Sequence, residues 1–119
     1  MSMVDQINKA VAAHGMWKAR LRNAIDAGKS EFTAGHVSAD NQCDFGKWLY
    51  SLPAIDHQTA QWQKVRELHA KFHREAGKVL GLALSGNKAE ADSCLAVGSP
   101  FAKVSLELTS AMMEWKKVS

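Results

Sequence analysis

Apolar side chains recur at alternating spacings of three and four residues over three long stretches of this chain. The stretches run from about residue 2 to 27, from about residue 59 to 84, and from residue 88 toward the C-terminus. This spacing places the apolar residues on one face of an α-helix, and no segment carries a convincing strand pattern. We therefore expect an all-α protein. In the first stretch the repeating positions are Ile7, Val11, His14, Lys18, Leu21 and Ile25.

A shorter helix is expected between the first two long ones. Residues 29–39 have no period and are predicted to form a loop. Asp40 is a candidate N-cap for a helix over residues 41–51, with Cys43 in its first turn. Backbone N–H groups there favour a thiolate. Gly46 weakens this helix and predicts a close approach to another backbone segment.

The last helical stretch has a clear start and an internal break. Asn87 followed by Glu90 resembles a capping box, so a helix is predicted to begin near Lys88. Pro100 is expected to kink or interrupt it. Together these elements predict one domain, residues 1–119, folded as an antiparallel four-helix bundle of three long helices and one short cysteine-bearing helix. Each helix carries one tryptophan, expected in the core or at a dimer contact: Trp17, Trp48, Trp62 and Trp115.

Composition excludes several classes of protein. The 15 basic and 12 acidic residues are scattered along the chain, which argues against nucleic-acid binding and against a membrane-surface segment. No targeting signal is recognisable, and the longest apolar run, residues 79–84, is too short to cross a bilayer. The two cysteines, Cys43 and Cys94, fit a reducing compartment better than a disulfide framework. We therefore expect a cytoplasmic protein.

Two histidines lie four residues apart on the long central helix. His69 and His73 leave the same helical face one turn apart, which presets half of a tetrahedral metal site. Such pairs are more often solvated or structural, so the pattern alone is weak. His14 also lies in an apolar stripe, where a buried histidine bonded to a carbonyl is the simpler interpretation. The remaining candidates are not expected to bind a metal: His36 and His57 are predicted at the surface, and Cys94 is predicted to be a small buried residue that fills space in the core.

A donor set for zinc nevertheless emerges from these positions. His14, Cys43, His69 and His73 each lie on or beside an apolar stripe, an unusual place for groups that need polar partners. Three imidazoles and one thiolate match zinc in softness and in number. A closed set of four leaves no position for a substrate, which argues against hydrolytic catalysis. No catalytic triad or phosphate-binding loop is recognisable either, so we expect a protein that is not an enzyme.

The motifs around these residues resemble the chemoreceptor zinc-binding domain family. The resemblance is carried by residues 14–18, 43–50 and 69–73, in which Cys43, Gly46 and Trp48 form the most specific motif. Phe45 stands where leucine is most expected. The resemblance extends over nearly the whole chain, to Trp115. It implies a three-histidine, one-cysteine zinc site at His14, Cys43, His69 and His73.

The same resemblance implies a function and its partners. It suggests a homodimeric bacterial domain that regulates chemotaxis receptors or diguanylate cyclases, in the same chain or in another. We expect a sensor of zinc or of an oxidant such as hypochlorous acid, working through a zinc-bound thiolate. Two alternatives stay open: a purely structural zinc site, and a hemerythrin-like di-iron protein.

Overall fold

A computed structural model describes residues 3–118, and all of its regular elements are helical. Ser2, where the first helix was predicted to begin, lies outside these residues. The described segments are, in chain order, α1 (Met3–Gly15), α2 (Trp17–Ala27), α3 (Ala34–Ser38), α4 (Asp44–Ser51), the 3₁₀ turn η1 (Asp56–Gln58), α5 (Ala60–Leu84), α6 (Lys88–Cys94) and α7 (Pro100–Lys117).

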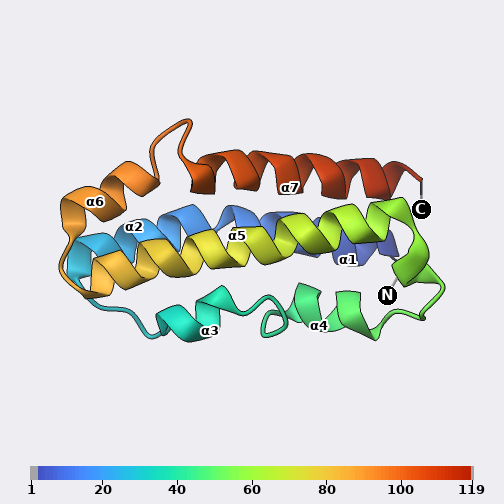
Figure 1. Ribbon diagram of the computed structural model, residues 1–119, viewed down its shortest axis with the longest axis horizontal. Coiled ribbons are helices and arrows are strands. Elements are labelled where there is room, and N and C mark those ends of the chain that lie inside the picture. Colours follow the sequence, from blue (N-terminus) through green and yellow to red (C-terminus); the bar gives the residue numbers. More distant parts are fainter. Residues whose placement is uncertain (1–2, 119) are drawn as a thin grey trace.

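The segments form four rows along the long axis of the molecule, and successive rows run in alternate directions (Figure 1). α1 and α2 make the first row, α3 and α4 the second, α5 the third, and α7 the fourth, with α6 turning the chain at one end (Figure 1). The all-helical prediction is therefore confirmed. The second row differs from the prediction, because it contains two short helices instead of one.

The long central helix was predicted correctly. α5 begins after Thr59, whose hydroxyl caps the helix by accepting a hydrogen bond from the Trp62 N–H at 3.2 Å. Its inward face packs against α7 and α2 and contributes much of the apolar core. The buried apolar residues of α5 are Trp62, Val65, Phe72, Ala76, Gly77, Val79, Leu80 and Ala83.

Two of the predicted long helices are divided. The first is interrupted at Met16, where the Met16 N–H bonds to Ala13 O at 3.3 Å, three residues back, directly after the poor helix former Gly15. The last is divided into α6 and α7: Ser99 caps α7 and Pro100 occupies its first turn, where a missing N–H costs nothing. The break predicted at Pro100 is confirmed. The start at Lys88 is also confirmed, although the Asn87 side chain makes no capping hydrogen bond.

Two local predictions were wrong. Residues 34–38, expected in a loop, form the helical turn α3, capped by the Thr33 side chain. The helix α4 begins at Asp44 and not at residue 41, with Cys43 as its N-cap in place of Asp40. Asp40 instead accepts a hydrogen bond from the Tyr50 hydroxyl. A cysteine is an unusual cap, and no sequence rule pointed to it.

Among the described residues, no helix is both long enough and apolar enough to cross a membrane. The tryptophans serve the packing inside the molecule. Trp17, Trp62 and Trp115 are buried, and the rings of Trp48 and Trp115 lie 5.9 Å apart. The Trp62 indole N–H donates to Leu49 O at 3.0 Å, which ties α4 to α5.

Candidate metal centre

His69 and His73 point from α5 into the interior of the molecule. Their side chains are buried, and their Nε2 atoms lie 3.1 Å apart, as expected for neighbours on one helical face. Because one helix carries both residues, the backbone fixes the spacing of their Cα atoms, and contacts from other elements orient the rings.

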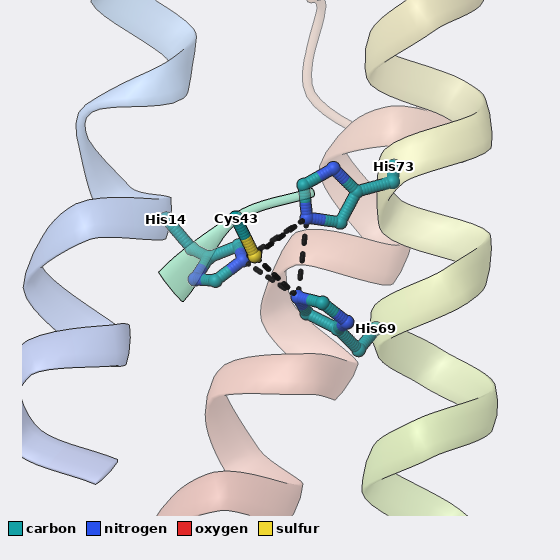
Figure 2. A group of neighbouring side chains, drawn as sticks. All are labelled: His14, Cys43, His69 and His73. Atoms are coloured by element: carbon teal, nitrogen blue, oxygen red, sulfur yellow. Dashed lines mark hydrogen bonds between the residues drawn. The ribbon is translucent and has the colours of Figure 1, made fainter. Parts of the chain in front are cut away.

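His14 and Cys43 approach this pair from two other helices (Figure 2). His14, in the last turn of α1, places its Nε2 atom 3.0 Å from Nε2 of His69 and 3.4 Å from Nε2 of His73. The Cys43 sulfur lies 3.3 Å and 3.5 Å from the same two nitrogens. All four donor atoms lie within 4.8 Å of one another. The convergence of these four side chains, distant along the chain, is thus observed.

Hydrogen bonds orient two of the three imidazoles. Nδ1 of His14 lies 2.8 Å from Ala10 O, and Nδ1 of His73 lies 2.9 Å from Val37 O. A carbonyl oxygen only accepts, so we assign the ring proton to Nδ1 in both residues, and the Nε2 lone pairs face the centre. Nδ1 of His69 is buried and has no hydrogen-bond partner among the described residues.

Lone pairs that converge in this way need a cation between them. Two acceptors 3.4 Å apart, with no proton to share, repel each other in a buried environment, and a divalent metal ion removes that repulsion. A tetrahedral zinc site would space its nitrogens about 3.3 Å apart, and its nitrogens from sulfur by about 3.6 Å, given bonds of about 2.0–2.1 Å and 2.3 Å. Five of the six edges, at 3.0–3.4 Å between nitrogens and 3.3–3.5 Å from the sulfur to His69 and His73, match these values, and the sixth, between His14 and Cys43, lies within 4.8 Å. The donor set therefore fits zinc.

The electrostatics of the pocket favour neutral imidazoles. Burial lowers the pKa of His14 to about 4 and that of His69 to about 2, and it also lowers the pKa of His73. These rings therefore carry no competing proton at neutral pH. A neutral imidazole is the form that binds a metal ion.

Cys43 behaves differently from the expectation that its helix position would favour the thiolate. Burial raises the pKa of the Cys43 thiol, and this outweighs the opposing hydrogen bond from the Gly46 N–H, 3.3 Å from the sulfur. The helix N-terminus alone does not ionise this cysteine. A divalent cation bound beside the sulfur would supply the missing stabilisation of the thiolate.

Gly46 positions the cysteine through a close backbone contact. A Cβ atom at this position would lie 1.8 Å from the Asp40 carbonyl oxygen, so only glycine lets the chain before Cys43 fold back against α4. The close approach predicted at Gly46 is therefore confirmed. Phe45, which replaces the expected leucine, packs its ring against His69, with centroids 5.1 Å apart. The larger side chain is accommodated without displacing the candidate ligands.

α3 supports the centre, and sequence reasoning missed it. Val37 in α3 supplies the carbonyl that orients His73, and α3 fits against α5 because residue 77 is glycine. A Cβ at Gly77 would lie 1.9 Å from Ser38 Oγ and 3.0 Å from Ala34 O. The available signals were Thr33 as an N-cap and a glycine one turn after His73. A five-residue helix is too short for its apolar spacing to be recognised.

The other histidines and the second cysteine lie apart from the centre. His36 is exposed, as predicted. His57 was expected at the surface but is half-buried, because its ring stacks on Trp62 with centroids 4.0 Å apart. Cys94 is half-buried and packs against the core, close to its predicted role as a filler. In the part of the chain described, the only metal-competent group of side chains is His14, Cys43, His69 and His73.

Comparison with known protein families finds one whose model spans the candidate ligands. A family model for the chemoreceptor zinc-binding domain matches residues 14–80, a stretch that contains all four candidate ligands. The match stops short of α6 and α7, so it is narrower than the resemblance over nearly the whole chain expected from the motifs. No curated protein and no solved structure matches the chain. Since the match covers more than half of the 119 residues, the chain belongs to the chemoreceptor zinc-binding domain family, whose members bind zinc.

Proposed function

We propose that His14, Cys43, His69 and His73 bind one zinc ion, and that the domain is a cytoplasmic bacterial sensor that signals through the state of this centre. One observation carries the proposal: the sulfur of Cys43 is both a candidate ligand and the N-cap of α4. Any change at the sulfur therefore alters the end of a helix as well as the metal site.

Bound zinc would hold the Cys43 sulfur as a thiolate and link α4 to α1 and α5. Two-electron oxidation of the thiolate by hypochlorous acid, which transfers its oxygen to the sulfur and leaves as chloride, would give a sulfenic acid that has no charge and is a weaker ligand. The same oxidation weakens the bond that Gly46 N–H donates to the sulfur. α4 is then held by its apolar contacts and by the hydrogen bond that Trp62 donates to Leu49 O. With fewer contacts, α4 can shift against α5. Loss of the metal without oxidation would have the same result, so zinc and an oxidant are both possible stimuli.

The output is proposed from the family. The described rows would form an antiparallel four-helix bundle that pairs with a second copy and acts on a chemotaxis receptor or a diguanylate cyclase. Two exposed apolar residues on α7, Leu106 and Met113, lie seven positions apart on one helical face and support a contact with another helix. The closed donor set, with no place for a substrate, supports regulation over catalysis.

The experiment is zinc analysis of protein purified without added metal, before and after a mild oxidant. We expect one zinc per chain, released on oxidation, and a roughly thousandfold weaker zinc affinity for Cys43→Ala, since one of four ligands is lost. Cys94→Ala is the matched control and should behave as wild type. Unchanged zinc affinity in Cys43→Ala would exclude this residue as a ligand.

A structural zinc site is the second candidate. The burial of all three histidines favours it, because a buried closed site exchanges its metal slowly. In that case oxidant leaves the zinc in place and chelation unfolds the domain. The di-iron alternative has less support, because the cluster contains a sulfur donor and no carboxylate, whereas bridged di-iron sites use carboxylates. Metal analysis separates these cases.

A further inference from the structure

His69 differs from the other two histidines of the centre in what holds its ring. Backbone carbonyl oxygens accept hydrogen bonds from Nδ1 of His14, at 2.8 Å, and from Nδ1 of His73, at 2.9 Å. Nδ1 of His69 is buried, and no described residue offers it a hydrogen-bond partner. The His69 side chain is also the most covered of the three, with 0% of its surface exposed. Neither the protein nor surface water therefore fixes a proton on this nitrogen.

The missing partner leaves the His69 ring a choice that the other two rings do not have. A proton on its Nε2 can be donated to Nε2 of His14, 3.0 Å away, or to Nε2 of His73, 3.1 Å away. A proton on its Nδ1 would instead be a buried donor without an acceptor, which is unfavourable. When no metal ion is bound, the Nε2–H form of His69 is therefore the more stable one, and its proton joins the three rings.

Metal binding requires the opposite form. A histidine that binds a metal ion through Nε2 carries its proton on Nδ1, and an outer acceptor almost always takes that proton in a hydrogen bond. The Ala10 and Val37 carbonyls play this part for His14 and His73. For His69, binding would break the hydrogen bond that its Nε2–H donates inside the centre and would leave an unpaired Nδ1–H in the core.

We infer that His69 changes its tautomer when the metal ion binds, and that it is the most weakly contributing of the three histidine ligands. The inference deepens the proposed function and rests on its zinc site. The proton on Nε2 is lost to solvent and another is taken from solvent by Nδ1, so the ring stays neutral and releases no net proton. A centre with one unsupported ligand gives up its metal ion more readily than one in which outer partners hold every ring.

The first test measures the tautomers directly, in the unaltered domain with ¹⁵N-labelled imidazoles. Two-bond ¹H–¹⁵N spectra show which ring nitrogen is protonated, before and after zinc is added to protein that a chelator has stripped of metal. We expect Nε2–H at His69 without metal and Nδ1–H with zinc, while His14 and His73 keep Nδ1–H in both states. The exposed His36 is the internal control and should not change. Nδ1–H at His69 without metal, or mixed tautomers in all three rings, would overturn the inference.

The second test compares His69→Ala with His73→Ala, a matched pair from one face of α5. Each variant lacks one buried imidazole, but only the His73 ring is held by an outer carbonyl. The zinc affinity should fall roughly tenfold further in His73→Ala than in His69→Ala, which is the low end of what an outer partner contributes. Circular dichroism checks that both variants are folded. An equal or larger loss in His69→Ala would overturn the inference, and if either variant does not fold, the spectra of the unaltered domain decide.

The inference and the sensor fail in different ways. Zinc that stays bound after oxidation would remove the sensor and leave the change of tautomer at His69 in place. A fixed tautomer at His69, with zinc released on oxidation, would keep the sensor and overturn this inference.

Discussion

Two sides of this molecule share one apolar core but differ in the length of the helices that contribute to it. α5 and α7 form a long pair in which Val104, Leu108 and Met112 are fully buried, and the rings of Phe72 and Phe101 lie 5.4 Å apart. α3 and α4 have five and eight residues, too short to be stable helices alone. They bury Val37, Phe45 and Leu49 in the common core, and their other contacts include single hydrogen bonds to α5, the close approaches at Gly46 and Gly77, and the candidate metal centre.

The difference shows where a signal can arise. Apolar burial over a long interface changes little when one side chain is altered chemically. A short element with one or two buried apolar residues depends more on its few directional contacts, and a single chemical event can remove several of them. The side of the molecule that carries Cys43 is therefore the side with the least independent stability, as expected of an element that moves.

Metal removal should separate the two sides most strongly. Chelation should raise amide hydrogen exchange in α3 and α4 by orders of magnitude, because zinc binding contributes roughly 10 kcal/mol to folding in small zinc domains. Protection in the middle of α5 and α7 should persist, since their apolar interface remains. Hydrogen exchange followed by mass spectrometry measures both. Equal loss of protection throughout would show that the domain unfolds as one unit and would favour the structural interpretation.

Gly46→Ala should have the next largest effect. The new methyl group meets the Asp40 carbonyl oxygen at 1.8 Å, so the backbone before Cys43 must move, which we expect to cost about 3 kcal/mol or more of unfolding free energy. The zinc affinity should fall with it. Gly35→Ala is the control, because nothing lies within 4 Å of its added Cβ. Chemical denaturation of both variants, with zinc titration, makes the comparison.

Gly77→Ala and Gly81→Ala test how α3 is seated, and they should have opposite signs. The first meets Ser38 Oγ at 1.9 Å and Ala34 O at 3.0 Å, so it should lower the unfolding free energy by about 1–3 kcal/mol. In Gly81→Ala the added methyl group meets only Ala34 Cβ, at 3.8 Å. This substitution should therefore raise the unfolding free energy by about 0.5–1 kcal/mol, as replacements of glycine inside a helix do. Ser38→Ala should restore part of the loss in Gly77→Ala. Losses of the same size at both glycines would contradict the close contact.

The pH dependence of zinc affinity should be modest, about 1.4 kcal/mol per pH unit. Burial raises the pKa of the Cys43 thiol and lowers those of the three histidines, so zinc displaces about one proton, from sulfur, at neutral pH. Affinity should therefore fall about tenfold for each unit of pH lowered from 8 to 7. In Cys43→Ala it should be flat over this range. Competition with a chromogenic chelator at several pH values measures the slope.

The same titration, continued below pH 6.5, tests whether α3 and α4 stay packed when the metal is absent. If α3 and α4 stay packed without metal, the histidines stay neutral well below pH 6.5. The slope of zinc affinity against pH then still corresponds to the release of about one proton. If these helices detach, the histidines regain ordinary pKa values and the slope steepens below pH 6.5. The titration thus reports whether the metal-free domain keeps its second row of helices.

The sequence by itself determined the helical class, the long helix after Thr59, the break at Pro100 and the inward direction of His14, His69 and His73. Each follows from local spacing along one helix, which is the same in any tertiary context. The close approach at Gly46 could also be predicted, because a glycine inside a helix lowers the stability of the helix and this loss needs a compensating contact.

Only the tertiary structure decided how the centre is supported. The Val37 carbonyl that orients His73, the place of α3 beside Gly77, and Cys43 as a helix cap depend on contacts between distant segments. The direction of the Cys43 pKa shift was likewise set by burial, which outweighed the local effect of the helix terminus. Burial depends on the packing of the whole chain, whereas a periodic pattern reports only which face of a helix turns inward.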